Sequence, residues 1–236
     1  KASGILCITP LVIEKYRKLG LLSIPEINKI KVIGGHPIDV NLFKPPENYP
    51  DEKVINIVST GRLAYEKGFH VIIEAFGELI KKYRNVHLHI IGEGNYREEL
   101  MNKVRKLELL SLVKFYGALE SKEIAEIYKS MHIFINHSLE TPYWQEYFGV
   151  ANLEAMSSEL PVITTDCGVI PWAVKDNAAI VKQEDVKELI KALENLIENK
   201  NLRIKLGQRG RNFVENNYTV EKVAKQYYSL IKEFAK

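Results

Sequence analysis

From residue 54 onward, short apolar runs alternate with longer stretches in which apolar side chains recur every three or four residues. Short apolar runs indicate buried strands, and the three-to-four spacing indicates amphipathic helices. The predicted strands cover residues 54–58, 86–91, 113–116, 132–136 and 162–165, with a further short apolar segment at 178–181. The predicted helices cover residues 69–83, 96–107, 122–130, 149–158, 185–199 and 202–216.

This alternation predicts the fold class. Strands separated by helices form a parallel sheet with helices on both faces, and right-handed crossovers give a doubly wound, Rossmann-like α/β domain. In such sheets the loops at the carboxyl ends of the strands line the ligand site. Here the polar and glycine-containing segments lie at those ends, at residues 61–62, 92–94, 117, 137–148 and 166–168. The pattern therefore predicts a small-molecule site at that edge of the sheet.

The two ends of the chain differ from this repeat. Residues 5–9 and 31–33 are predicted strands around a helix at 11–19, and the glycines and prolines at 34–37 and 45–46 predict turns and a linker. A last amphipathic helix is predicted at 220–234. We therefore divide the chain into residues 1–50, 51–216 and 217–236.

Composition and charge exclude some classes of protein. Hydrophobic residues make up 46% of the 236 residues and charged residues 27%, which argues against disorder. The net charge of +3 is too small to indicate nucleic acid as a partner. No apolar run approaches the roughly 20 residues that a membrane-spanning helix needs.

The cysteines and histidines give little support for a disulfide or a metal site. Cys7 and Cys167 are the only cysteines and lie far apart, which favours a reducing cytoplasm. His87 and His89 share one face of a predicted strand, but no acidic residue or third histidine accompanies them. We therefore expect packing or surface roles for both and no bound metal.

Two cations beside a glycine follow the first predicted strand. Gly61 permits close approach of the backbone to a ligand, and Arg62 and Lys67 precede a helix whose free N–H groups and dipole favour anions. Charge-assisted hydrogen bonds of about 1.5–3 kcal/mol each would suit a diphosphate. The spacing alone equally allows two solvated loop cations.

Two glutamates eight residues apart, Glu146 and Glu154, enclose the start of the helix at 149–158. Eight helical residues cover about 12 Å, whereas the carboxyl groups of a hydrolytic pair lie roughly 5–9.5 Å apart. The spacing therefore favours two contacts on one elongated ligand. Gly149 and Val150 would offer backbone N–H groups to a phosphate there. Glutamates at this spacing are also common on helix surfaces.

Gly92 and Gly94 follow another predicted strand, and a tight turn explains them as well as phosphate binding does. The residue three positions beyond Gly94 is Arg97, so the full glycine spacing of a dinucleotide-binding loop is absent. This weakens an assignment as a nicotinamide-dependent oxidoreductase.

The motifs and their order along the chain resemble those of the retaining glycosyltransferases of family 4, which have the two-domain GT-B fold. The segments that carry the likeness are Gly61-Arg62-Leu63 with Glu66-Lys67-Gly68, residues 88–94, the segment 146–156 with Phe148-Gly149 inside it, Pro161-Val162-Ile163, and the stretch 32–43. Each motif alone is loose, but five in order are specific, and they extend over most of the chain.

The resemblance implies roles for the candidate site residues. Arg62 and Lys67 would bind the donor diphosphate and stabilise the charge on the departing nucleotide. Glu146 would contact the transferred sugar and completes the catalytic set, while Glu154 would hold the ribose hydroxyls. The other implied donor contacts are Gly61, Phe148, Gly149 and Val150 around the sugar and phosphates, and Gly117, Ala118 and Leu119 at the base.

The resemblance also implies the reaction and its setting. The donor would be a UDP- or GDP-sugar and the acceptor a glycan or a lipid-linked molecule, with no cofactor and no metal. The enzyme would be cytoplasmic and serve polysaccharide or glycolipid synthesis. Contact with the inner face of a membrane stays open, because Lys81, Lys82 and Arg84 gather at one helix end, although a solvated surface explains them better.

The resemblance assigns the three segments as well. Residues 1–50 would be the tail of an N-terminal acceptor domain with the interdomain linker, and residues 51–216 the nucleotide-sugar-binding domain. Residues 217–236 would form a helix that crosses back toward the N-terminal domain. We therefore expect the chain alone to bind a nucleotide sugar weakly and to transfer little.

The chain departs from the family pattern at three places. His137-Ser138 stands where Pro-Ser is usual, residues 139–145 lengthen the next loop, and Trp172 stands where glutamate is common. Glu140 thereby rivals Glu146 as the first glutamate, though Phe148-Gly149 favours Glu146. For His137 we favour a structural role over a contact with the donor sugar. For Trp144 and Trp172 we favour packing over stacking on a sugar.

Two other functions fit the same pattern. One is a nucleotide-sugar epimerase on the same fold, against which the loop at 61–67 and the two spaced glutamates favour the transferase. The other is a nucleotide-binding or partner-binding module without chemistry of its own, for which the length of the native gene product is the discriminating observation.

Overall fold

A six-stranded sheet forms the centre of the protein, which a computed structural model describes for residues 4–21, 27 and 29–234. Every pairing is parallel, and the strand order is β5-β4-β3-β6-β7-β8. The strands are β3 (Ile55–Thr60), β4 (Val86–Ile91), β5 (Val113–Phe115), β6 (Ile133–Asn136), β7 (Val162–Thr165) and β8 (Ala179–Val181). This is the predicted doubly wound, Rossmann-like sheet, and its order reverses between β3 and β6, where such sheets bind their ligands.

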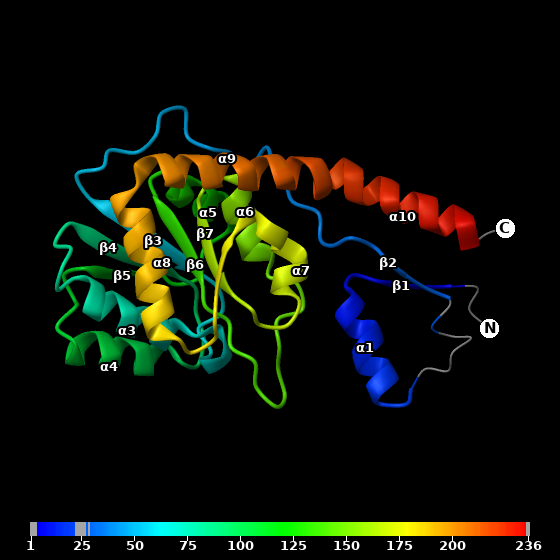
Figure 1. The fold of residues 1–236 in the computed structure, drawn as a ribbon, viewed down its shortest axis with the longest axis horizontal. Helices are drawn as coiled ribbons and strands as arrows, with labels where there is room; N and C mark the ends of the chain where they lie inside the picture. Colours follow the sequence, from blue (N-terminus) through cyan, green and yellow to red (C-terminus); the bar gives the residue numbers. More distant parts are fainter. Residues whose placement is uncertain (1–3, 22–26, 28, 235–236) are drawn as a thin grey trace.

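Helices cover both faces of the sheet (Figure 1). Helices α3, α4 and α8 contribute to the hydrophobic cluster on one face, and α5, α6, α7 and α9 to the cluster on the other. The helices are α3 (Phe69–Leu79), α4 (Arg97–Lys106), α5 (Ser121–Tyr128), α6 (Val150–Ser157), α7 (Ile170–Val174), α8 (Val186–Glu198), α9 (Lys200–Asn217) and α10 (Val220–Phe234), with short 3₁₀ turns η1 (Tyr65–Lys67) and η2 (Lys175–Asn177).

Neighbouring residues of the central strand β3 pack against helices on opposite faces of the sheet. Ile57 of β3 packs in the cluster that contains Ile72 of α3, whereas Val58 packs in the cluster that contains Met156 of α6. Because both faces of the sheet are buried, consecutive positions of β3 must be apolar. This explains why a parallel-sheet strand appears in the sequence as a continuous apolar run.

The predicted helix at 69–83 is too long. Helix α3 ends at Leu79, but Ile80 and Tyr83 still pack against the same core after the helix has ended. The apolar spacing therefore continues into a turn. Helix α7 was not predicted, because five residues with a proline in the first turn are too short to show a helical period.

A smaller unit precedes this domain. Strands β1 (Ile5–Cys7) and β2 (Ile30–Val32) pair in parallel, and α1 (Pro10–Lys18) lies beside them. Helix α10 continues from α9 toward this unit (Figure 1), where Glu233 pairs with Lys31 at 3.1 Å. None of the helices in the described ranges has both the length and the apolar character that crossing a membrane requires.

Candidate functional site

A cavity of about 380 Å³ lies where the strand order reverses. Its volume falls in the usual range for small-molecule sites. Its walls come from the ends of β3 and β6, the start of α6 and the linker. The lining residues are His36, Ser59, Thr60, Gly61, Arg62, Lys67, Phe69, Asn136, Glu146, Tyr147, Phe148, Gly149, Val150 and Ala151. We call it the switch-point cavity. It brings together all three residues of the predicted catalytic set.

Lys67 and Glu146 form an ion pair in this cavity. The Lys67 Nζ lies 2.6 Å from Glu146 Oε2, and the two side chains are 21% and 12% exposed. The hydroxyl of Ser138 lies 3.2 Å from the same carboxylate oxygen, and Thr165 donates a 2.6 Å hydrogen bond to the Ser138 carbonyl. Glu146 is therefore held by Lys67 of η1 and by Ser138 of the loop after β6, and Thr165 of β7 fixes Ser138 in turn.

The lengthened loop adds an aromatic ring to this pair. The Lys67 Nζ lies 4.7 Å from the centroid of the Trp144 ring, within the range of a cation–π contact. Trp144 is half-buried. Packing was the preferred prediction for Trp144, but the ring contacts a predicted catalytic lysine. Glu140, the rival of Glu146, is exposed and does not line the switch-point cavity.

The second predicted cation lies at the rim of the cavity. Arg62 pairs with Glu66 at 2.5 Å, and its side chain is 57% exposed. The backbone N–H of Gly61 donates to the Ile91 carbonyl at 3.0 Å, so this group belongs to the sheet and not to the cavity. Gly61 thus contributes space and no hydrogen bond, and an anion that enters must compete with Glu66 and Glu146 for the two cations.

The start of helix α6 faces the same cavity. Gly149 is the N-cap residue, with φ 75°, a left-handed conformation that costs glycine little. Val150 and Ala151 follow as the first helical residues, and the N–H groups of a first helical turn have no partner within the helix. Phe148 is buried, with its ring 5.2 Å from His36. The predicted anion site at 148–150 therefore lines the same cavity as the two cations.

Glu154 lies one turn further into α6, outside the residues that line the switch-point cavity. Burial raises the pKa of its carboxyl group to about 7, because the charged form loses contact with water. Its charge acts on Tyr128, whose hydroxyl donates a 3.0 Å hydrogen bond to Thr60 at the cavity wall. Glu154 is therefore a poorly solvated acid close to the cavity.

The predicted base contacts lie elsewhere in the sheet. Gly117, Ala118 and Leu119 follow β5, and β5 is two strands away from β3. The carbonyl of Gly117 accepts a 2.8 Å hydrogen bond from the Gly92 N–H, which joins the ends of β4 and β5. The structure does not bring these three residues into the switch-point cavity, and their contact with a base stays a prediction.

Seven residues that line the cavity were not predicted as ligand contacts, namely His36, Ser59, Thr60, Phe69, Asn136, Tyr147 and Ala151. Thr60 and Asn136 end the strands β3 and β6, His36 comes from the linker, and Ser138, which was not predicted either, contacts Glu146. A polar residue at the carboxyl end of a predicted strand indicates a possible ligand contact, and Thr60 and Asn136 could have been found by this signal. For His36 the sequence has no comparable sign, because only the tertiary fold brings the linker to Phe148.

His137 and His89 lie outside the switch-point cavity. His137 is fully buried between β6 and η1, and within the described residues neither ring nitrogen has a hydrogen-bond partner. Burial lowers the pKa of His137 to about 4, so the ring is neutral at pH 7. His89 contacts the Tyr116 hydroxyl at 2.9 Å and Asn56 at 3.2 Å. The described residues contain no group of three or more side chains arranged to hold a metal ion.

Gly68 fixes the distance between the Lys67 loop and β6. Its φ is +64°, and an added Cβ would lie 1.9 Å from the His137 carbonyl oxygen. We expect Gly68→Ala to lower the free energy of unfolding by about 2–3 kcal/mol, measured by urea denaturation. Gly77→Ala is the matched control, since an added Cβ there meets only the side chains of Leu107 and Leu109. Equal stability of the two variants would contradict this account of the contact.

Residues 41–213 match the family described as "Glycosyl transferases group 1". The chain belongs to this family. Among curated proteins, the chain is similar to the capsular polysaccharide biosynthesis glycosyltransferase CapM of Staphylococcus aureus, with 29% identity over 89% of this chain and 57% of CapM. It is also 32% identical to one subunit of the human phosphatidylinositol N-acetylglucosaminyltransferase, over 86% of this chain and 40% of that protein.

A solved structure agrees with the group 1 assignment. The C-terminal domain of the group 1 glycosyl transferase LpcC from Francisella tularensis is 29% identical and superposes with a TM-score of 0.69, over 78% of this chain and 99% of that domain. The predicted glycosyltransferase family and the predicted GT-B type of Rossmann-like domain are thus confirmed, and retention stays a prediction. The chain spans about a third to nearly two thirds of the length of the curated relatives it matches.

Proposed function

We propose that this chain binds a nucleotide sugar in the switch-point cavity and that the sugar is transferred to an acceptor with retention at the anomeric carbon. One observation carries the proposal. Arg62, Lys67 and the first turn of α6 converge on a single cavity, where two cations and free N–H groups oppose one carboxylate, Glu146. Such a cavity favours a ligand with two or more negative charges, as a diphosphate has.

The same geometry supports a mechanism. When the bond between the sugar and the diphosphate breaks, negative charge develops on the leaving oxygen, and Arg62 and Lys67 stabilise it. Glu146, held by Lys67 and Ser138, accepts hydrogen bonds from hydroxyls of the transferred sugar. We propose that no metal takes part, because the two cations and the helix start supply the positive charge. Retention follows the family resemblance of the motifs, and the anomeric configuration of the product, read by NMR, tests it.

The family match favours the transferase over the epimerase and over a module without chemistry. The names of the relatives point to acceptors of two kinds, a capsular polysaccharide and a phosphatidylinositol lipid. We therefore propose a glycan or a lipid-linked acceptor for this chain, with peripheral contact to a membrane in the second case. Cys7 and Cys167 are free thiols, which supports a cytoplasmic location.

The three-part division also belongs to this proposal. Residues 51–216 would bind the donor, while residues 1–50 and the crossing helix α10 would belong with an acceptor domain. The contact between α10 and β2 through Glu233 and Lys31 supports this assignment of the two ends.

Calorimetric titration tests the proposal directly. UDP, GDP, ADP and their common sugar conjugates are titrated into the wild type, Arg62→Ala and Glu154→Ala, with and without a chelator. We expect one nucleotide family to bind, both substitutions to weaken it about tenfold or more, and the chelator to have no effect. Binding of every nucleotide with equal affinity, or binding that neither substitution changes, would overturn the proposed site.

A further inference from the structure

A second cavity, of about 430 Å³, lies beside the switch-point cavity. One wall is α1, another is the lengthened loop, and the third is the segment after β7. It is lined by Leu11, Glu14, Lys15, Lys18, Leu19, Glu140, Thr141, Pro142, Tyr143, Trp144, Gln145, Asp166 and Gly168. We call it the loop cavity. The loop itself projects from the domain as a hairpin closed by a bridge between Thr141 and Trp144 (Figure 1).

The two cavities share a thin wall. Trp144 and Gln145 line the loop cavity, and the next three residues, Glu146, Tyr147 and Phe148, line the switch-point cavity. Trp144 also contacts Lys67, which belongs to the switch-point cavity. A molecule in the loop cavity would therefore lie directly beside the predicted reacting groups.

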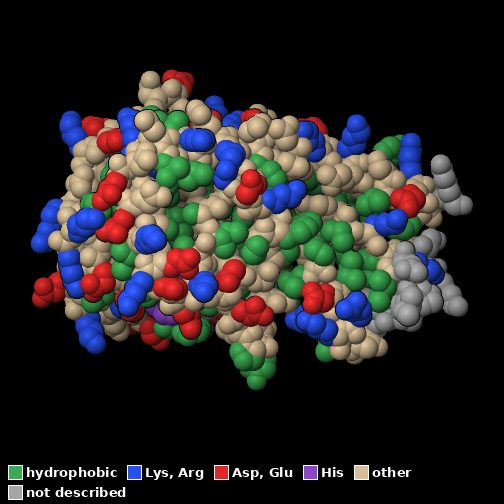
Figure 2. Space-filling model, viewed as in Figure 1, with side chains coloured by type: hydrophobic (Ala, Val, Ile, Leu, Met, Phe, Trp, Pro, Cys, Tyr) green, Lys and Arg blue, Asp and Glu red, His purple; other side chains and the backbone are tan. Residues whose placement is uncertain are grey.

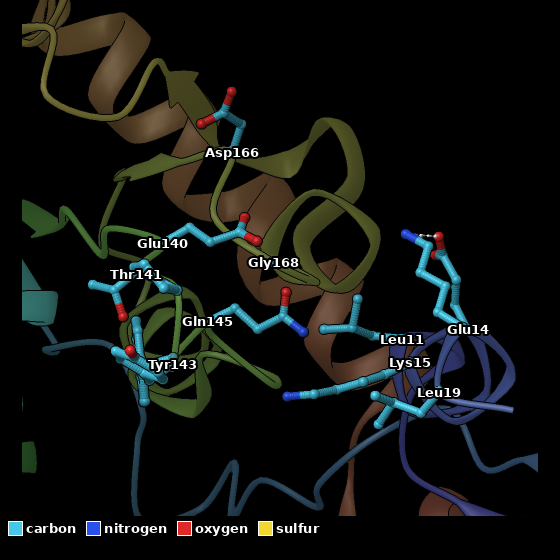
Figure 3. Close-up of a pocket in the computed structure, with 13 residues that line it drawn as sticks. Leu11, Glu14, Lys15, Leu19, Glu140, Thr141, Tyr143, Gln145, Asp166 and Gly168 are labelled. Atoms are coloured by element: carbon cyan, nitrogen blue, oxygen red, sulfur yellow. Dashed lines mark ion pairs between the residues drawn. The ribbon is translucent and has the colours of Figure 1, made fainter. Parts of the chain in front are cut away.

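Hydrogen-bonding groups enter the loop cavity from opposite walls (Figure 3). Lys15 of α1 and Gln145 of the loop extend into it from opposite sides, and the carboxylate of Glu140 points into it beside Gln145. Lys15 also donates a 3.0 Å hydrogen bond to the hydroxyl of Tyr147, which connects α1 to the shared wall. An amide, a carboxylate and an ammonium group together can serve both the donor and the acceptor sides of hydroxyl groups.

Aromatic side chains complete this surface. Tyr143 is 95% exposed at the tip of the loop, where Figure 2 shows hydrophobic side chains projecting below the domain, and Trp144 is half-buried beneath it. A tyrosine exposed to this degree contributes little to the core of the described structure. A flat apolar ring next to polar groups matches a ligand that has both C–H faces and hydroxyl edges, as a sugar ring has.

The charges distinguish the loop cavity from its neighbour. The switch-point cavity has two cations and one carboxylate, whereas the loop cavity has three carboxylates and two ammonium groups. One of those ammonium groups, on Lys18, is paired with Glu14 at 2.8 Å. Glu140 and Asp166 therefore repel an anionic ligand, so a phosphate or a nucleotide fits the loop cavity poorly.

From this geometry we infer that the loop cavity binds an uncharged, hydroxyl-rich sugar ring of the acceptor, with Trp144 and Gln145 as specificity-determining residues. The inference rests on the proposed function, which it deepens by naming the acceptor class as carbohydrate at this subsite. The lengthened loop then forms the wall that separates donor from acceptor, and it presents Trp144 to both.

Saturation-transfer NMR with simple glycosides tests the inference. The probes are methyl α-glucopyranoside, methyl α-mannopyranoside and methyl N-acetyl-β-glucosaminide, with glucose 6-phosphate as the anionic probe. We expect at least one glycoside to bind, glucose 6-phosphate to bind more weakly, and a saturating nucleotide not to displace the glycoside. Gln145→Ala and Glu140→Gln are expected to weaken the glycoside about tenfold, and Trp144→Ala at least as much.

Two variants serve as controls. Trp172→Ala removes the other tryptophan, and Tyr228→Ala removes a 60% exposed ring on α10, so neither is expected to change glycoside binding. No glycoside binding by the wild type, or binding that Gln145→Ala and Glu140→Gln leave intact, overturns the inference. Displacement by the nucleotide, or tighter binding of glucose 6-phosphate, overturns it as well. Nucleotide binding without glycoside binding rejects only this inference, whereas glycoside binding without nucleotide binding rejects only the proposed donor site.

Discussion

Lys67→Ala is expected to slow the release of nucleoside diphosphate from the bound nucleotide sugar by about 10²–10³-fold. We expect this large loss of rate because the Lys67 side chain is the less exposed of the two cations in the switch-point cavity. Its exposed fraction is 21%, against 57% for Arg62. A charge in a poorly solvated position acts more strongly on the leaving group than one in water. The rate is compared with that of the wild type under the same conditions, so a slow wild-type reaction does not weaken the test.

The ion pair with Glu146 gives Lys67 a second function that the experiment must separate. Removing the lysine also leaves the Glu146 carboxylate without its 2.6 Å partner. Lys103→Ala is a matched control, because Lys103 pairs with Glu74 at 2.7 Å, is 28% exposed and lies outside both cavities. It is expected to leave the rate unchanged.

A nucleoside without phosphates separates the two functions further. If Lys67 binds the diphosphate, Lys67→Ala weakens UDP or GDP but leaves uridine or guanosine unaffected. If Lys67 only positions Glu146, then Glu146→Gln alone reproduces the loss, and the double variant is no worse than either single one. Equal weakening of the nucleotide and the nucleoside would show that the substitution has disturbed the fold and not the diphosphate contact.

The sheet and its ligand-binding edge could be predicted because each depends on local pattern. Strands such as β3 must be apolar at consecutive positions, and the polar residues after them mark one edge of the sheet. Arg62 and Lys67 follow such a strand, and Glu146 was noted for its spacing from Glu154. The family resemblance, and not the local pattern, selected these three residues as the catalytic set. Their meeting in one cavity follows from the strand order, which places β3 beside β6.

The loop could not be predicted at the same level, since its contacts join parts of the chain that are distant in sequence. Trp144 lies beside Lys67, 77 positions earlier, and Lys15 reaches Tyr147 across 132 positions. Neither contact leaves a periodic pattern. The predicted base contacts at 117–119 came from motif order alone, and the sheet order places them two strands away from β3. The order of the motifs thus identified the loops along the chain, but it did not predict how far apart these loops lie in the fold.

If Glu154 accepts hydrogen bonds from two ribose hydroxyls, as the resemblance implies, Glu154→Ala is expected to remove both bonds and to lower nucleotide affinity by about 10²-fold. Unlike Lys67→Ala, this substitution weakens nucleosides and nucleotides alike, because the ribose is common to both. A loss confined to the nucleotides would contradict the ribose contact and place Glu154 near the phosphates.

The pH dependence of binding provides a further test of Glu154. Its pKa of about 7 means that the carboxyl group is largely ionised at pH 8 and largely protonated at pH 6. The ionised form is the better acceptor for ribose hydroxyls, so nucleoside affinity is expected to fall about tenfold from pH 8 to pH 6. Glu154→Gln is expected to bind with nearly the same affinity at both values. A nucleoside is the proper probe, because a phosphate group titrates in the same range.

Stability is expected to change with pH in the opposite direction. Because burial raises the pKa of Glu154 above its ordinary value of 4.5, the folded protein binds more protons than the unfolded chain between pH 4.5 and pH 7. The contribution of Glu154 to the free energy of unfolding therefore falls as pH rises through that window, by about 3 kcal/mol. Glu154→Gln removes this loss, so the variant should gain stability relative to the wild type at pH 8 while it loses affinity. A variant that loses both at pH 8 would show that Glu154 stabilises the fold, and the ribose assignment would then fail.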